Sequence, residues 1–189
     1  MPTADGAHPN AGWVVEHAKD KPVAMSADGT LTVTGNTRAY LVEDYMGLRW
    51  ADFKYERADM FKKPLEFTLD LSNVNCGCLA CVYLVAMKDP SGDSSNYCDM
   101  AENVAPGIGG GTCTELDILE ANNHAMQTAI HTELGGSFGS GNCDKNGCFA
   151  RVGGPQAPGD QQWKYGRGKT IDSARPFDVR VAVDEVRAL

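Results

Sequence analysis

The feature that most constrains the fold is a strict alternation of apolar and polar residues at two places far apart in the chain. "LEFTLDL", over residues 65–71, puts Leu and Phe at every odd position and Glu, Thr and Asp between them. "FDVRVAVDE", from Phe177 onward, repeats the pattern with valines against charged side chains. Because successive side chains of a strand point to opposite faces, this alternation predicts half-buried β-strands.

Other segments extend the same pattern. Shorter strands are predicted within 29–35 and 38–44, and the continuously apolar run at 81–87 is typical of a central, buried strand. Stretches rich in Gly and Pro, such as "DPSGDSS" and "GGPQAPGD", lie between these patterns and indicate loops. Several short strands with Gly-rich turns predict an all-β antiparallel sandwich. The length of 189 residues predicts a single domain over 1–189.

Composition argues against two classes of partner. The chain has 17 Lys and Arg residues against 25 Asp and Glu residues, a net charge of −8. Without a basic cluster, phosphate groups cannot be neutralised, so we expect no nucleic-acid partner. No apolar run approaches the roughly 20 residues that span a bilayer, so we expect no membrane partner. The start, "MPTADGAHPNAG", lacks the basic and apolar regions of a signal peptide. Either the protein is not exported, or its signal is not part of this sequence.

The seven cysteines leave an odd one out of any set of disulfides within the chain. "CGCLAC" is compatible with a thiolate metal cluster, but no second Cys or His cluster at typical spacing completes a four-ligand set. Disulfides formed in an oxidising compartment are the favoured interpretation, and buried, inert thiols are the third. The cysteines form two groups, namely Cys76, Cys78, Cys81, Cys98 and Cys113, and then Cys143 and Cys148.

The acidic segment "TELDILEANNH", residues 114–124, fits two conformations. As a helix, it begins with a capping box formed by Thr114 and Asp117. One helix face would then carry Asp117, Glu120 and His124, which offer oxygen and nitrogen ligands to a divalent metal. The simpler version of this helix is a solvated acidic surface. Residue propensities alone leave the choice between helix and strand open.

As a strand, the segment makes a sharper prediction. Glu115 and Asp117 point to the same side, whereas Glu120, five residues after Glu115, points to the other side in a regular strand. One extra residue, a β-bulge near Ile118 or Leu119, returns Glu120 to the first side. The two glutamates are then roughly 13 Å apart along the backbone, and inward-leaning side chains bring their carboxyls to about 5–6 Å. That separation is typical of retaining glycosidases. Asp117 between them would raise the proton affinity of a neighbouring carboxylate, or share a proton with it.

Several motifs in the same order resemble one family. "GIGGGTCTELDILEAN", "FTLDLSNVNCGCLACVYLVAM", "NYCD" and "CDKNGC" are similar to segments of glycoside hydrolase family 7, the cellobiohydrolases and endoglucanases. The likeness runs from about Phe67 to Cys148. It implies a concanavalin A-like β-jelly roll, which favours the strand over the helix for residues 114–124.

The resemblance also implies roles by position. The family's nucleophile corresponds to Glu115, its general acid/base to Glu120, its assisting carboxylate to Asp117 and its active-site histidine to His131. Substrate-binding positions correspond to Tyr83, Tyr97 and Asp99. The implied reaction is the retaining hydrolysis of β-1,4-glucosidic bonds in cellulose or a related β-glucan. It needs no metal and no organic cofactor, and the implied protein is a secreted monomer with a polysaccharide substrate.

The same resemblance implies a disulfide between Cys98 and Cys113, worth roughly 3 kcal/mol for a loop of that size. Cys76 matches a cysteine whose family partner lies downstream of the last residue of this sequence. Cys143 and Cys148 match cysteines that each pair elsewhere in the family, and their pairing in this chain, with one another or otherwise, stays open.

Departures from the family limit what carries over. Leu119 stands where the family usually has tryptophan, and Phe138 stands at the position of a product-site arginine. The tunnel tryptophans have no clear counterparts, so an open-cleft endoglucanase is expected rather than a processive enzyme. Much of the family sequence would follow Leu189, so we expect a jelly roll that is incomplete at its C-terminus. The alternative is a catalytically weakened or inactive jelly-roll protein that binds β-glucan. Retention of both Glu115 and Glu120 argues against it, because binding alone needs neither.

Overall fold

A computed structural model of the chain describes residues 11–16, 23–45, 49–61, 63–100, 112–132 and 140–183. The chain divides into two compact units. The first comprises residues 1–57, 87–97 and 105–110, and the second comprises residues 58–86, 98–104 and 111–189.

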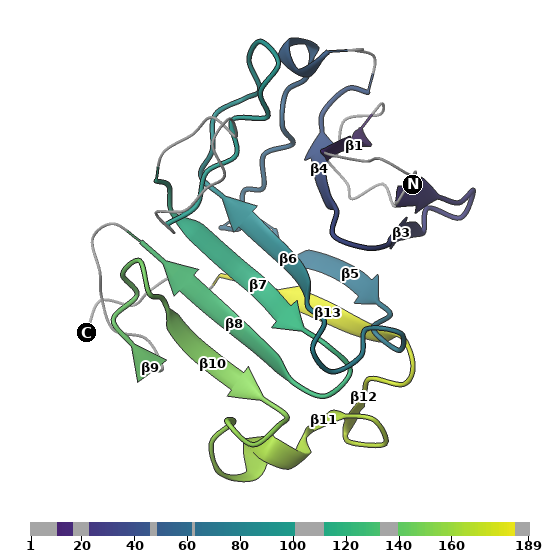
Figure 1. Cartoon of the computed structure of the whole chain (residues 1–189), viewed down its shortest axis with the longest axis vertical. Coiled ribbons are helices and arrows are strands. Elements are labelled where there is room, and N and C mark those ends of the chain that lie inside the picture. Colours follow the sequence, from purple (N-terminus) through teal and green to yellow (C-terminus); the bar gives the residue numbers. More distant parts are fainter. Residues whose placement is uncertain are drawn as a thin grey trace. The chain divides into compact units, whose positions relative to one another are not determined.

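The second unit contains a five-stranded antiparallel sheet in the order β6-β7-β8-β10-β9 (Figure 1). Its strands are β6 (Ala80–Val85), β7 (Glu115–Ala121), β8 (Met126–His131), β10 (Cys148–Val152) and β9 (Ser140–Gly141). The acidic segment is therefore a strand, and both helical interpretations of it are wrong. The apolar run at residues 81–87, typical of a central strand, forms a strand at an edge of the described sheet. Among the described strands, β6 pairs only with β7, and its Cys81 is exposed.

A second, smaller sheet pairs β5 (Leu65–Leu69) with β13 (Phe177–Val181), in antiparallel register and more than 100 residues apart in sequence. Both strands follow the predicted alternation, with half-buried apolar residues and exposed polar ones. Figure 1 shows β5 and β13 behind the larger sheet.

The two sheets of the second unit enclose an apolar core, which is the expected arrangement of a sandwich. Leu71, Leu119 and Ala121 are its fully buried members. Partly buried residues from both sheets and from the loop after β5 pack against these three: Phe67, Leu69, Val74, Ala80, Val82, Met126, Phe177 and Val179. This arrangement of two packed sheets confirms the prediction of an all-β sandwich. Burial of the apolar surface holds one sheet on the other.

Shorter elements fix the turn between β7 and β8. A 3₁₀ helix, η2 (Gly159–Trp163), leads into β11 (Tyr165–Gly166), which pairs in parallel with β12 (Ile171–Asp172). The hydroxyl of the buried Tyr165 donates to the backbone oxygen of Asn122 at 2.7 Å, and the hydroxyl of Ser173 donates to that of Asn123 at 2.7 Å. These bonds anchor the turn, and with it the register of β7 against β8.

The first unit contains two antiparallel pairs, β1 (Gly12–Glu16) with β4 (Arg38–Val42) and β2 (Val23–Met25) with β3 (Leu31–Val33). A 3₁₀ turn, η1 (Trp50–Asp52), follows β4. Aromatic rings pack there in edge and tilted contacts, with Tyr40 between Trp50 and Tyr55.

Two disulfides are present, Cys98–Cys113 and Cys143–Cys148, with Cα atoms 5.7 and 4.3 Å apart. The expected pairing of Cys98 with Cys113 is confirmed, and Cys143, whose pairing the sequence left open, pairs with Cys148. The other three cysteines, Cys76, Cys78 and Cys81, are exposed and form no disulfide. Across the described ranges, no group of three or more His, Cys, Asp or Glu side chains is arranged to hold a metal ion. Nor does any helix within those ranges have the length and apolar character that crossing a bilayer requires.

Candidate active site

Strand β7 carries an extra residue between Asp117 and Glu120. On its β6 side, Tyr83 lies opposite Asp117 and Val82 opposite Leu119, so Ile118 has no partner on β6. On its β8 side, Thr128 alone spans the two-residue step between Asp117 and Glu120. The hydroxyl of Thr128 donates to the backbone oxygen of Asp117 at 2.6 Å and so satisfies an acceptor beside the irregularity. The bulge predicted at Ile118 or Leu119 is confirmed.

The bulge returns Glu120 to the face that carries Glu115 and Asp117. Leu119 and Ala121, on either side of Glu120, are buried in the apolar core, so Glu120 points away from that core. Asp117 is buried, whereas Glu115 and Glu120 are half-buried. All three carboxylates therefore belong to one face of the sheet. The carboxyl separation of about 5–6 Å between Glu115 and Glu120 stays a prediction.

Residues directly opposite one another in antiparallel strands point to the same side, so the register assigns further side chains to this face. Three rows cross the sheet. The Glu115 row contains Val85, Glu115 and His131. The Asp117 row contains Tyr83, Asp117, Ala129 and Phe149. The Glu120 row contains Cys81, Glu120, Gln127 and Arg151.

Asp117 and His131 form the central pair of this face. Nε2 of His131 lies 3.2 Å from Oδ2 of Asp117. Burial, followed by the negative charge of Glu120, raises the pKa of Asp117 to about 6, although the charge and hydrogen bond of His131 act in the opposite direction. Asp117 therefore exchanges its proton near neutral pH rather than near pH 4, the usual range of an aspartate.

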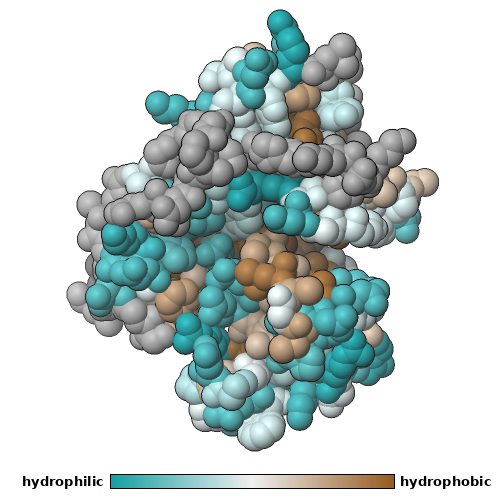
Figure 2. All heavy atoms as spheres, viewed as in Figure 1, coloured by the Kyte–Doolittle hydropathy of each residue, from teal (hydrophilic) through white to brown (hydrophobic). Residues whose placement is uncertain are grey.

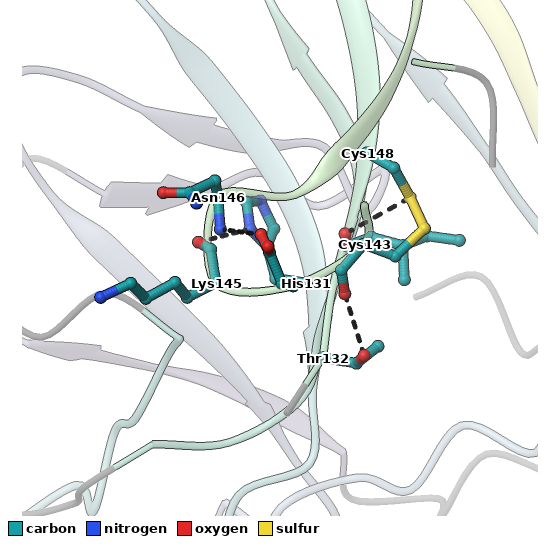
Figure 3. The surroundings of a disulfide bond; sticks show 8 residues. His131, Thr132, Cys143, Lys145, Asn146 and Cys148 are labelled. Atoms are coloured by element: carbon teal, nitrogen blue, oxygen red, sulfur yellow. Dashed lines mark hydrogen bonds between the residues drawn. A yellow bond between two sulfur atoms is a disulfide. The ribbon is translucent and has the colours of Figure 1, made fainter. Parts of the chain in front are cut away.

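The disulfide loop 143–148 orients His131 from its other side (Figure 3). Nδ1 of His131 lies 3.2 Å from the backbone oxygen of Lys145, which can only accept, so Nδ1 carries a proton. Because Nδ1 is occupied in this way, Nε2 is the atom that meets Asp117. Gly147 lies against the imidazole at φ +79°, and a Cβ there would overlap the ring. The loop thus needs glycine at this position.

The carboxylate of Glu120 is held by Gln127 and, through it, by Arg151, and the sequence analysis identified neither residue. The side-chain amide of Gln127 donates to Oε2 of Glu120 at 2.6 Å, and Nε of Arg151 donates to Oε1 of Gln127 at 2.9 Å. Gln127 was open to detection, because it shares the strand parity of His131 four residues later. Arg151 was not, because its place depends on the pairing of β10 with β8.

The remaining expected site residues separate into two groups. Tyr83 lies opposite Asp117 on β6, and the charge of Asp99 contributes to the raised pKa of Asp117. Asp99 is placed by the Cys98–Cys113 disulfide and by a parallel bridge to Thr112. Tyr97 belongs to the first unit, where it is buried with the guanidinium of Arg38 3.5 Å from its ring centroid. Its substrate-binding role stays a prediction.

The metal-binding alternative is not supported. His124 lies in the turn after β7, where its backbone N–H donates to Oδ1 of Asn122, and it is not on a helix face with Asp117 and Glu120. Phe138, at the position of the product-site arginine, lies outside the described residues. Figure 2, drawn from the same side as Figure 1, shows hydrophilic and hydrophobic residues next to one another in the middle of the view.

Comparison with curated proteins gives relatives that are named as endoglucanases and exoglucanases. The chain is 31% identical to "Endoglucanase type C" of Fusarium oxysporum over 176 residues, which are 75% of the chain and 38% of that protein. It is 25% identical to "Exoglucanase GH7B" of Limnoria quadripunctata over 210 residues, 83% of the chain and 44% of that protein. The chain thus spans less than half of the length of these relatives. No family model matches the chain.

Solved structures give a consistent result. An endoglucanase I complexed with cellobiose superposes with a TM-score of 0.65 at 26% identity, covering 88% of the chain and 49% of that structure. The endocellulase EGI of Humicola insolens superposes with a TM-score of 0.56 at 25% identity, covering 85% of the chain and 44% of that structure. The likeness confirms the predicted concanavalin A-like jelly roll.

Proposed function

We propose that this chain, which belongs to glycoside hydrolase family 7, hydrolyses β-1,4-glucosidic bonds in cellulose or a related β-glucan with retention of configuration. The observation that carries the proposal is the bulge of β7, which returns Glu120 to the face of Glu115 and Asp117. Two carboxyls on one face can act on the two ends of a single bond, one as nucleophile and the other as acid.

In the first step, Glu120 gives its proton to the glycosidic oxygen while Glu115 attacks the anomeric carbon. The carbon–oxygen bond to the leaving sugar breaks, its electron pair stays on that oxygen, and Glu115 becomes the covalently bound ester. In the second step, the ionised Glu120 takes a proton from water, which displaces Glu115. Two inversions at the same carbon give net retention.

Asp117 and His131 support these two reaction steps as a pair that holds a proton. Asp117 keeps a proton to about pH 6, which limits the number of negative charges crowded on the face that carries Glu115. His131 keeps Asp117 in place through its Nε2, since its Nδ1 is fixed by the Lys145 carbonyl. Tyr83, Tyr97 and Asp99 are proposed to contact the sugar chain.

The substrate is proposed to bind as a polysaccharide in an open cleft, with cleavage inside the chain. The endoglucanase names among the relatives and the lack of clear counterparts to the family's tunnel tryptophans support this choice over a processive enzyme. The two disulfides suit an oxidising compartment, so we propose that the protein acts outside the cell, as a monomer and without a cofactor.

The decisive experiment uses aryl β-cellobiosides and variants of the two glutamates. Glu115→Gln should reduce turnover to the limit of detection, and Glu120→Gln should slow substrates with poor leaving groups by about 10²–10⁴-fold. With added azide, Glu115→Ala should form the α-glycosyl azide and Glu120→Ala the β-glycosyl azide, because azide attacks the sugar or its ester respectively. Glu66→Gln is the matched control and should retain activity. Glu66, on β5, forms an exposed ion pair with Arg180 on β13.

Two results would contradict the proposal. Unchanged turnover in Glu115→Gln removes the nucleophile assignment. Binding of cello-oligosaccharides by a wild-type protein that releases no product from carboxymethylcellulose, mixed-linkage glucan or aryl cellobiosides would favour the binding-only alternative. A fall in viscosity that precedes the release of short sugars is the result expected for cleavage inside the chain.

A further inference from the structure

The Glu120 row contains a feature that the proposed mechanism does not use. Three side chains on three neighbouring strands, Glu120 on β7, Gln127 on β8 and Arg151 on β10, stand directly opposite one another. They are joined by two hydrogen bonds of 2.6 and 2.9 Å. All three are half-buried, so these bonds are partly shielded from competing water.

The charge of Arg151 settles which way the amide of Gln127 points. A guanidinium has only donors, so the amide group facing it must be the carbonyl oxygen, Oε1. The NH₂ group is then turned to Glu120, where it meets an acceptor, Oε2. The reverse orientation would put donor against donor at one end and oxygen against oxygen at the other.

Arg151 is itself held in place. Its Cζ lies 4.9 Å from the ring centroid of Phe149, two residues earlier on the same face of β10. A cation over an aromatic ring is attracted to it, and the ring also limits the rotamers of the long side chain. Phe149 in turn meets the edge of His131, with ring centroids 6.1 Å apart. The row is therefore fixed from strand to strand rather than at a single bond.

Because Oε2 of Glu120 accepts from the amide, the proton of the neutral acid is favoured on the other oxygen, Oε1. When Glu120 ionises, the bond from Gln127 becomes charge-assisted and is reinforced by the cation behind it. The stabilisation thus grows as negative charge develops on Glu120, which is the condition for lowering a transition state rather than a ground state.

We propose that Gln127 and Arg151 are positioning residues that hold the carboxyl of Glu120, present its Oε1 for proton donation and stabilise the carboxylate left behind. The inference rests on the proposed function, in which Glu120 is the acid. Neither residue is required to touch the sugar.

The test compares substrates that do and do not need an acid. Gln127→Met keeps the length of the side chain and removes the amide. It should lower kcat/KM for phenyl β-cellobioside, a poor leaving group, by about 10-fold or more. For 2,4-dinitrophenyl β-cellobioside, whose leaving group departs without protonation, kcat/KM should stay nearly unchanged. Arg151→Met should act in the same direction, and the double variant should be no worse than Gln127→Met, because both residues act through one bond.

Gln161→Met is the matched control, since Gln161 lies in η2 and donates to Asp160 instead. It should change neither rate. An equal loss on both substrates in Gln127→Met, or no loss on either, overturns the positioning role.

A second measurement does not depend on turnover. The side-chain amide signals of Gln127 in a ¹H–¹⁵N spectrum, assigned by their loss in Gln127→Met, should shift in Arg151→Met and in Glu120→Gln but not in Gln161→Met. Signals that do not move refute the hydrogen-bonded row even if the enzyme is active. If the variants show these shifts but the wild-type protein hydrolyses neither cellobioside, the proposed function is refuted, and with it the catalytic role of the row.

Discussion

Asp117 differs from its two acidic neighbours because it is buried and faces a histidine rather than solvent. Glu115 and Glu120 are half-buried, and on β8 they lie opposite His131 and Gln127. Burial penalises the charged form of a carboxyl, and the nearby charge of Glu120 adds to that penalty, so the pKa of Asp117 rises to about 6. A residue that would be mostly ionised in the unfolded chain at pH 5 is therefore largely protonated in the fold.

This raised pKa links Asp117 to stability in a defined pH window. Between about pH 4 and pH 6 the folded state binds more protons at Asp117 than the unfolded state does, so the free energy of unfolding falls as pH rises. Relative to Asp117→Asn, the wild-type protein should lose about 2–3 kcal/mol across this window and stay level above it. Urea unfolding of both proteins at pH 4, 5, 6 and 7 measures the difference. A difference that is flat, or that rises with pH, would contradict the raised pKa.

At the residue scale, sequence reasoning succeeded where a single strand held the information. Glu115, Asp117 and Glu120 lie within six positions of one strand, so once the family resemblance favoured the strand over the helix, period-two geometry with one bulge placed them on one face. Tyr83 and His131 needed the family resemblance. Arg151 needed the pairing of two strands whose register depends on a loop, and no local pattern carries that information.

At the element scale, the loop 143–148 acts on the face through its backbone. The Lys145 carbonyl meets Nδ1 of His131, and the disulfide closes the loop behind it. The sequence left the pairing of the two cysteines open and gave no sign of the carbonyl, because a backbone group leaves no trace in residue identity. The one signal in the sequence was the glycine at position 147 within this loop. Gly147 has a positive φ and lies close to the imidazole, which explains why the loop needs glycine there.

Gly147→Ala should displace His131 from Asp117, because the new Cβ would overlap the imidazole ring. Turnover of an aryl β-cellobioside is expected to fall by about 10-fold or more. Gly168→Ala is the matched control, since Gly168 has a similar φ of +67° and nothing within 4 Å of the added Cβ. Both variants carry a similar backbone strain of about 1–2 kcal/mol, and Gly147→Ala alone adds the overlap with the imidazole, so thermal unfolding should shift at least as far for Gly147→Ala. Equal activities in the two variants would show that the placement of His131 does not matter.

At the scale of the whole molecule, alternation was enough to predict the sandwich. Apolar residues at every second position of β5 and β13 face the core that β7 completes with Leu119 and Ala121. What alternation did not supply was the strand order, since β6 reads as a central strand and lies at an edge of the described sheet. An apolar run identifies a strand that packs on one side or both, and only pairing tells the two apart.

The two disulfides should contribute unequally to stability. Cys98–Cys113 closes 15 residues and Cys143–Cys148 closes 5, which corresponds to about 3 and about 2 kcal/mol of lost chain entropy in the unfolded state. Replacing each pair by two alanines should therefore lower the free energy of unfolding more for the first pair. Activity should show the reverse order, because only the second pair closes the loop that orients His131. Urea unfolding and cellobioside turnover of the two double variants test both orders, and a parallel ranking in the two assays would contradict the expectation.

The bulge of β7 also restricts how this protein can change over generations. Replacing a side chain in this strand alters one position, but losing or gaining a single codon between Asp117 and Glu120 would exchange the parity of everything beyond it. The acid would turn into the apolar core and Leu119 or Ala121 would emerge where the acid had been. Related proteins can therefore differ by substitutions in this segment, but an insertion or deletion between Asp117 and Glu120 is not tolerated.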